Sequence, residues 1–240
     1  GITSAIGQGK VAFISSLLQG LHSFGVMKRP GRQSAISSVE KGKESERVTS
    51  YLGAEIDTLT IPKTFSQRML RTTSFSGQVA LSTLHEAWNE AKLGEIDADR
   101  IGLVIGGSNF QQRELTQTHE EYKNRLYYLR PTYGLSFMDS DLCGLCTESF
   151  GIQGLAYTIG GGSASGQVAI IQAIQAVQSG QIDVCIAMGA LMDLSYWECQ
   201  GFRSIGAMGS DYYAKEPALA CRPYDKNRDG FIYGESCGVV

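Results

Sequence analysis

The sequence predicts an α/β fold in which helices cover a sheet. Short apolar runs rich in β-branched residues occur at 101–105, 155–159 and 182–188, and each is typical of a strand buried on both faces. Segments with apolar residues at helical spacing lie between these runs. The contents of 42% hydrophobic and 19% charged residues are ordinary for a globular protein with one or two cores.

The first half of the chain is expected to form helices around a polar segment. Residues 10–21 carry apolar side chains at helical spacing and end at glycine, and residues 76–93 form a second such helix. Between them, residues 28–50 are rich in both charges and are expected to form a solvated surface loop. A polar and aromatic helical excursion is expected over 109–133, followed by a helix over 136–150.

The chain is organised around the stretch from Thr158 to Gln178. Three glycines lead into Ser163, and a helical segment follows in which larger apolar residues recur about every third position, namely Val168, Ile171, Ile174 and Val177. The segment lies beside an apolar strand, so we expect a buried central helix with Ser163 at its N-terminus. Free backbone N–H groups and the helix dipole favour developing negative charge at such a position.

Composition excludes several classes of function. A net charge of −3 and a pI near 5.7 argue against nucleic-acid binding. No apolar run approaches the roughly 18 residues of a membrane span. Six cysteines in such a chain suggest reduced thiols and a cytosolic compartment. Cys143 and Cys146 have CxxC spacing, but no second pair completes a zinc site, so buried structural thiols are expected.

Ser163 invites comparison with the nucleophile elbow G-x-S-x-G of serine hydrolases. The second glycine of that motif is replaced by Ser165, and the three histidines (His22, His85 and His119) all precede Ser163, whereas hydrolases of this type place theirs after the serine. The glycine run also lacks the lysine of a P-loop and the spacing of a dinucleotide turn. Surface or half-buried positions are expected for all three histidines.

The segment from Asp225 to Ile232 resembles the start of a calcium-binding EF-hand loop. Its twelfth position is Ser236 instead of a bidentate glutamate, and Pro223 and Gly234 stand where flanking helices belong. We therefore expect no metal here, but a turn held by its own carboxylates and arginines.

Residues 222–235 (RPYDKNRDGFIYGE) resemble a signature of the ketosynthase family, the condensing enzymes of fatty-acid and polyketide synthesis. The likeness extends to Gly1-Ile-Thr-Ser, to the strand before Ser108, and to the segments 151–154 and 179–189. It implies a thiolase-like fold of two similar halves, each built on a mixed five-stranded sheet, with the nucleophile helix buried between the sheets. Residues 1–240 then form the N-terminal half with cap insertions, and the C-terminal half is absent. Both ends of the chain are expected to be cut from a longer polypeptide.

One departure decides the function that the resemblance implies. Ketosynthases carry a cysteine nucleophile where the likeness places Ser163, and a serine hydroxyl is far less ionised than a thiol. The chain is therefore similar to ketosynthase-like decarboxylases, which convert malonyl-acyl carrier protein to acetyl-acyl carrier protein for polyketide starters or β-branching, without condensation. That step needs hydrogen-bond donors at the thioester oxygen but no acyl-enzyme.

The resemblance also implies partners and further site residues. The substrate is carried on the phosphopantetheine of an acyl carrier protein, so no separate cofactor is expected, and a cytoplasmic homodimer is implied. Two catalytic histidines would come from the C-terminal half, so this chain alone should be inactive. Met138 and Phe202 match positions near the acyl pocket, although core packing accounts for them equally well.

Two alternatives stay open. One is a non-catalytic partner subunit of the chain-length-factor type, which typically carries glutamine at the nucleophile position. The other is a condensing ketosynthase whose cysteine was mutated to serine. The motif of active ketosynthases also differs from this chain at four neighbouring positions, which favours a natural serine; these are Gly160, Gly161, Gly162 and Ala164.

Overall fold

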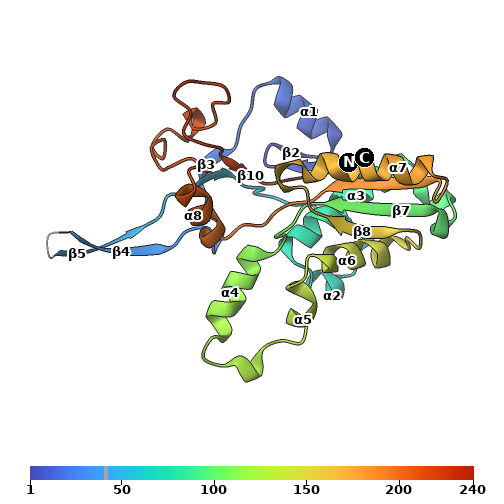
Figure 1. The fold of residues 1–240 in the computed structure, drawn as a ribbon, viewed down its shortest axis with the longest axis horizontal. Coiled ribbons are helices and arrows are strands. Elements are labelled where there is room, and N and C mark those ends of the chain that lie inside the picture. The colour runs from blue at the N-terminus through green and yellow to red at the C-terminus, as the bar shows by residue number, and fades with distance from the viewer. Residues whose placement is uncertain (41–42) are drawn as a thin grey trace.

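A mixed six-stranded sheet in the order β2-β1-β11-β9-β7-β8 forms the centre of the computed structural model, which describes residues 1–40 and 43–240 (Figure 1). β7 pairs in parallel with β8 and β9, whereas β11 is antiparallel to β9 and β1. The predicted mixed sheet of five strands is present, with the two-residue β2 added at one edge. The strands are β1 (Ile2–Ser4), β2 (Gly7–Gln8), β7 (Ile101–Gly106), β8 (Ala156–Ile159), β9 (Val184–Gly189) and β11 (Ser236–Val239).

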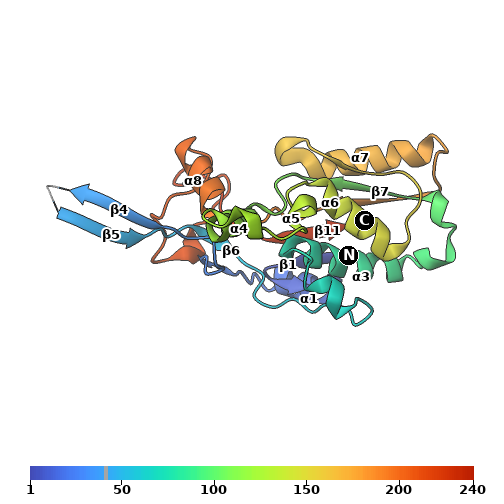
Figure 2. The ribbon, with the colours of Figure 1, turned by 90° about the horizontal axis from the view of Figure 1, so that it is seen from below.

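Helices cover both faces of this sheet, as Figure 2 shows. α7 (Ser165–Gln178) lies on one face, and α3 (Phe75–Glu90) and α6 (Ser140–Phe150) pack on the other. Successive side chains of a strand point to opposite faces. Accordingly, Leu103 and Ile105 pack in the cluster with α3 and α6, whereas Val104 packs against Ala169 and Ala173 of α7.

α7 buries one side in this chain, which differs from the expected fully buried helix. Its alanines face the sheet, while Ile171 and Ile174 are each 51% exposed and Val177 is 41% exposed. The predicted helical spacing is confirmed, but the spacing did not say which residues face the sheet. Small side chains face the sheet because they allow the helix to approach the strands closely, as the packing of Ala169 and Ala173 against Val104 shows.

The remaining helices follow the predicted segments with shifted ends. α1 (Lys10–Leu18) ends before the predicted Leu21, and no residue of this fully described helix is buried. α4 (Gln112–Tyr122) and the short α5 (Tyr133–Ser136) form the excursion expected over 109–133 and its continuation (Figure 1). Two helices, α2 (Gln67–Leu70) and α8 (Tyr196–Ser204), were not predicted, although Ser195 and Glu198 form a capping box at the start of α8.

The prediction of a surface loop over 28–50 is wrong for residues 35–40 and 43–48, which form two strands. β4 (Ala35–Glu40) and β5 (Lys43–Val48) form an antiparallel ribbon that projects from the body; residues 41 and 42 of this segment lie outside the described residues (Figure 1). Gln33 fastens its base, because its side-chain oxygen accepts hydrogen bonds from Thr49 Oγ1 (2.7 Å) and the Tyr51 N–H (3.0 Å). Polarity was a poor guide here, since a two-stranded ribbon needs no apolar face to complete its ladder of hydrogen bonds.

A small second sheet lies between the ribbon and the main sheet. It contains β10 (Tyr233–Gly234), β6 (Leu52–Ala54) and β3 (Phe24–Val26) in that order.

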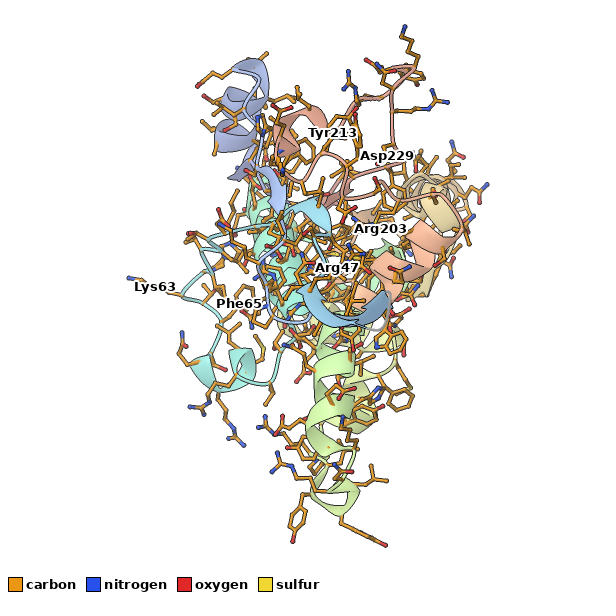
Figure 3. The ribbon with its side chains drawn as sticks, turned by 90° about the vertical axis from the view of Figure 1, so that its left-hand side faces the viewer. Arg47, Lys63, Phe65, Arg203, Tyr213 and Asp229 are labelled. Carbon is orange, nitrogen blue, oxygen red and sulfur yellow. The ribbon has the colours of Figure 1, made fainter. Side chains whose placement is uncertain are left out.

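In Figure 3, Lys63 points away from the body while Phe65 lies toward it, and Phe65 packs in the core with α3. Among the helices of the described residues, none has the length and apolarity needed to cross a membrane.

Candidate functional site

Three loops meet at the edge of the sheet where parallel β7, β8 and β9 end. The N–H of Gly107 donates to the Ile159 carbonyl (3.0 Å), and the N–H of Ala190 donates to the Gly106 carbonyl (3.2 Å). The carboxyl ends of parallel strands are where α/β proteins place their binding sites. The turn that carries Ser163 follows β8 at this edge.

Ser163 lies in a single 3₁₀ turn, Gly162–Ala164, directly before α7. The predicted position at a helix N-terminus is therefore confirmed. The residue is exposed, and its hydroxyl makes no hydrogen bond to any described residue. Gly162 has a φ of 56°, in the left-handed region that glycine adopts without steric strain.

The neighbouring Ser165 supplies the hydrogen bonds that shape this turn. Ser165 is buried, its Oγ donates to the Gly162 carbonyl (2.7 Å), and the Gly161 N–H donates to the same Oγ (2.9 Å). Sequence reasoning used Ser165 to compare motifs and assigned it no structural role. A serine three residues after a glycine at a helix start is the available signal, because serine side chains commonly bond to nearby backbone groups there.

Glycines press the start of α7 against the strand ends. A Cβ on Gly106, the last residue of β7, would lie 2.2 Å from the Ser165 carbonyl oxygen. A Cβ on Gly166 would lie 3.9 Å from the Gly189 Cα, and the reverse distance is the same. Backbone therefore meets backbone here, and the position of the turn relative to the sheet is fixed.

Met138 and Phe202 lie on different parts of this surface. Met138 is 41% exposed, and the adjacent Asp139 accepts hydrogen bonds from the N–H groups of Asn109 (2.8 Å) and Phe110 (3.1 Å) in the loop after β7. Phe202 of α8 packs in a separate cluster and contacts Phe231 edge-to-face, with ring centroids 5.4 Å apart. The structure thus ties Met138 to the β7 loop and Phe202 to the packing beneath α8.

A charged cluster lies buried behind these loops and was missed by sequence reasoning. It comprises Arg29, Arg32, Glu55, Arg113, Asp193 and Glu235. Arg32 is completely buried and pairs with Asp193 (2.8 Å) and with Glu235, while Arg113 pairs with Asp193 (2.9 Å). Burial opposes the charge of Arg32, but Tyr233 and the neighbouring carboxylates outweigh it and raise the pKa of the guanidinium.

The charged cluster fixes the loop between β9 and α8. Arg32 donates to the Leu194 carbonyl, and the Arg113 N–H donates to the Asp193 carbonyl (2.8 Å). Tyr233, which lies under the Arg32 guanidinium, donates to the Met192 carbonyl (2.6 Å). These contacts hold backbone, so the arrangement of the cluster is that of a structural anchor.

The cysteines and histidines lie as expected. Cys143 and Cys146 are buried; burial raises the pKa of Cys237 to about 12 and that of Cys185 to about 11, whereas Cys221 is exposed. His22 and His119 are exposed and His85 is half-buried, although His22 lies beyond the end of α1. In the part of the chain that the structure describes, no group of His, Cys, Asp and Glu could hold a metal ion.

The segment that resembles an EF-hand loop is a turn held by its own side chains, as predicted. Asp225 accepts hydrogen bonds from the Asn227 N–H (2.7 Å) and from Arg222 (3.1 Å). Asp229 accepts from the Ser210 N–H (2.9 Å) and, like Tyr213, lies in the part of the chain after α8 that is labelled in Figure 3. Its carboxylates are therefore occupied by backbone and arginine.

The family model described as the N-terminal domain of beta-ketoacyl synthase matches residues 1–240. The chain belongs to this family. It is 60% identical to the "Polyketide biosynthesis malonyl-ACP decarboxylase PksF" of Bacillus subtilis (strain 168), over the whole chain and 55% of that protein. It is also 26% identical to a "3-oxoacyl-[acyl-carrier-protein] synthase 1" of Buchnera aphidicola (subsp. Baizongia pistaciae, strain Bp), over 56% of that protein.

The fold has the same relatives. A crystal structure of a beta-ketoacyl synthase from Burkholderia phymatum STM815 superposes with a TM-score of 0.73 at 19% identity, covering 99% of this chain and 56% of that one. The thiolase-like α/β fold predicted from the sequence is thereby confirmed. The chain spans just over half the length of each of these relatives.

Proposed function

We propose that this chain is the N-terminal half of a ketosynthase-like decarboxylase, which converts malonyl-acyl carrier protein to acetyl-acyl carrier protein in polyketide biosynthesis without condensing it. The observation that carries the proposal is Ser163, a serine that stands where the resemblance to the ketosynthase family places the nucleophilic cysteine. The 60% identity to a relative named as a malonyl-ACP decarboxylase supports it. The product would supply polyketide starters or β-branching.

The chemistry of Ser163 fits decarboxylation better than acyl transfer. A serine hydroxyl is far less ionised than a thiol and needs an adjacent base before it can attack a thioester. Decarboxylation breaks only the bond between the malonyl Cα and its carboxylate. CO₂ leaves, the electron pair of the broken bond moves onto the thioester oxygen as an enolate, and water then supplies the proton that is added to the α-carbon. Donors aimed at that oxygen lower the barrier.

The start of α7 supplies such donors within this chain. The backbone N–H of Ser163 and the positive end of the α7 dipole would stabilise the enolate oxygen or the departing carboxylate, and Ser163 Oγ can donate a further hydrogen bond. Two histidines of the C-terminal half would supply the main stabilisation, so the chain alone would be inactive. Met138, exposed beside the loop after β7, would line the acyl channel together with Phe202.

The partners follow from the same proposal. The apolar side of α7, with Ile170, Ile171, Ile174 and Val177 exposed, would pack against the C-terminal half. The whole protein would be a cytoplasmic homodimer that receives malonyl on the phosphopantetheine arm of an acyl carrier protein, and it would need no further cofactor.

The test is to incubate the intact protein, C-terminal half included, with malonyl-carrier protein and to follow the mass of the carrier protein. Accumulation of acetyl-carrier protein without a ketosynthase partner supports the proposal and excludes the chain-length-factor alternative. A protein that becomes acylated and elongates chains would overturn it. Ser163→Cys is the matched variant. We expect an acyl-carrier protein to acylate the introduced cysteine and to leave Ser163 of the native protein unmodified.

A further inference from the structure

Ser165 is a buried hydroxyl that the proposed chemistry does not use. Ser163, two residues earlier, is exposed and has no hydrogen-bond partner among the described residues, whereas Ser165 makes two side-chain hydrogen bonds. The two serines are therefore not equivalent. One faces outward at the start of α7 and the other faces into the turn.

The two bonds of Ser165 close the turn from the inside. Its Oγ accepts from the Gly161 N–H (2.9 Å) and donates to the Gly162 carbonyl (2.7 Å), so the residues on both sides of one peptide bond are held. Glycine loses more backbone freedom on ordering than any other residue, and Gly160, Gly161 and Gly162 stand in a row. Without the Ser165 hydroxyl, the three glycines could adopt many backbone conformations. The observed one, with a φ of 56° at Gly162, would then be only one among these.

Ser165 is itself fixed to the sheet. Its carbonyl oxygen lies where a Cβ on Gly106 would come within 2.2 Å, at the end of β7, and the following Gly166 lies against Gly189 at the end of β9. A continuous chain of contacts thus runs from the strand ends through Ser165 to the Ser163 turn. The Ala164 N–H completes it by donating to the Gly161 carbonyl (3.1 Å).

We propose that Ser165 is a positioning residue, which preorganises the Ser163 turn so that its backbone donors meet the negative charge developing on the malonyl thioester. The inference rests on the proposed function. Preorganised donors need no reorganisation when charge develops, so the effect of Ser165 falls on the chemical step and leaves binding of the carrier protein unchanged. Its hydroxyl does not touch the substrate.

The kinetic test compares Ser165→Ala with Ser179→Ala in the intact protein. Ser179 Oγ donates to the Ala176 carbonyl (2.9 Å) just after the other end of α7, so each variant removes a hydrogen-bonded hydroxyl at or next to one end of the same helix. We expect Ser165→Ala to lower kcat for decarboxylation about tenfold with KM unchanged, and Ser179→Ala to leave both unchanged. Ser165→Thr should restore kcat, and Ser165→Cys should give an intermediate value. Equal effects of the two alanine variants would overturn the inference.

A second readout does not depend on decarboxylation. In a Ser163→Cys, Cys221→Ser background, alkylation by iodoacetamide across pH reports the pKa of the introduced thiol, which a helix N-terminus lowers. We expect added Ser165→Ala to raise that pKa and slow alkylation at neutral pH, and added Ser179→Ala to do neither. If the parent protein lacks decarboxylase activity but the thiol responds in this way, the proposed function fails and the positioning role stands. An unmoved pKa refutes the positioning role.

Discussion

The charged cluster and the Ser163 turn lie at the same end of the sheet, but they are built in opposite ways. In the charged cluster, Arg32, Asp193 and Glu235 are almost completely buried and joined by ion pairs. In the turn, Ser163 carries an exposed neutral hydroxyl and follows three glycines in sequence. The turn is held by backbone groups and by the Ser165 side chain. This chain therefore holds loops with buried charge, whereas it holds the turn with backbone groups and a neutral hydroxyl.

The largest expected effect comes from breaking the charged cluster. Arg32→Met should lower the free energy of unfolding by about 3–5 kcal/mol, because it leaves the Asp193 and Glu235 carboxylates buried without their central cation. Urea unfolding measures the loss. Arg100→Met, which removes an exposed pair with Asp183, is the control and should cost far less. Similar losses in the two variants would show that burial of the cluster is not what makes it important.

The next effect comes from the contact between the turn and the sheet. Gly106→Ala should destabilise the protein by about 1–3 kcal/mol, since the new methyl group collides with the Ser165 backbone and neither element can move aside. Gly160→Ala is the matched control, because a Cβ there meets open space, and it should change stability by no more than about 0.5 kcal/mol. Thermal unfolding of the two variants side by side decides whether this contact is as tight as described.

Alkaline pH should lower the stability of the protein through the buried neutral thiol of Cys237. Burial raises the pKa of Cys237 from 9.0 to about 12, so above pH 9 the unfolded thiol loses its proton while the folded thiol keeps it. The unfolded state then binds fewer protons, and stability falls as pH rises from about 9 to 11, by up to about 1.4 kcal/mol per pH unit for this thiol. Urea unfolding at several pH values measures the slope. Cys237→Ala should reduce it, and an unchanged slope would contradict this assignment.

The smallest expected effect is at the reactive position itself. Ser163→Ala should change the free energy of unfolding by less than about 0.5 kcal/mol, because the side chain is exposed and its hydroxyl is not hydrogen-bonded to any described residue. A substantial loss, measured by urea unfolding, would mean that Ser163 helps to hold the turn. Ser163 and Ser165 would then both stabilise the turn.

The parts of the fold that follow local pattern were predictable. Apolar runs gave β7, β8 and β9, and a glycine run before a periodic apolar segment placed Ser163 at the start of a helix. The side of α7 that meets the sheet was not predictable from spacing. Spacing identifies the buried side of a helix only when the opposite side is polar, and α7 carries alanines on one side and larger apolar residues on the other. The close packing of the alanines on the strands decides which side is buried.

The charged cluster could not be predicted for a different reason. Arg32 belongs to a polar segment whose local sequence predicts exposure to solvent. Its partner Glu235 is 203 positions away in the sequence. No short-range pattern links two such residues, and ion pairs form only after the sheet brings β11 beside the small sheet. Ser165 was overlooked although a serine near a helix start is a usable signal, because that signal does not say which backbone groups the hydroxyl will bond.

The glycine contacts at the start of α7 also define how this region can vary over evolutionary time. Gly106 is closed to any residue with a side chain, because the backbone of α7 occupies the space. No described residue lies within 4 Å of a Cβ on Gly160, so substitutions there meet no steric barrier within this chain. New specificities at this site should therefore arise by change on the outward side of the turn, while the side that faces the strands stays the same.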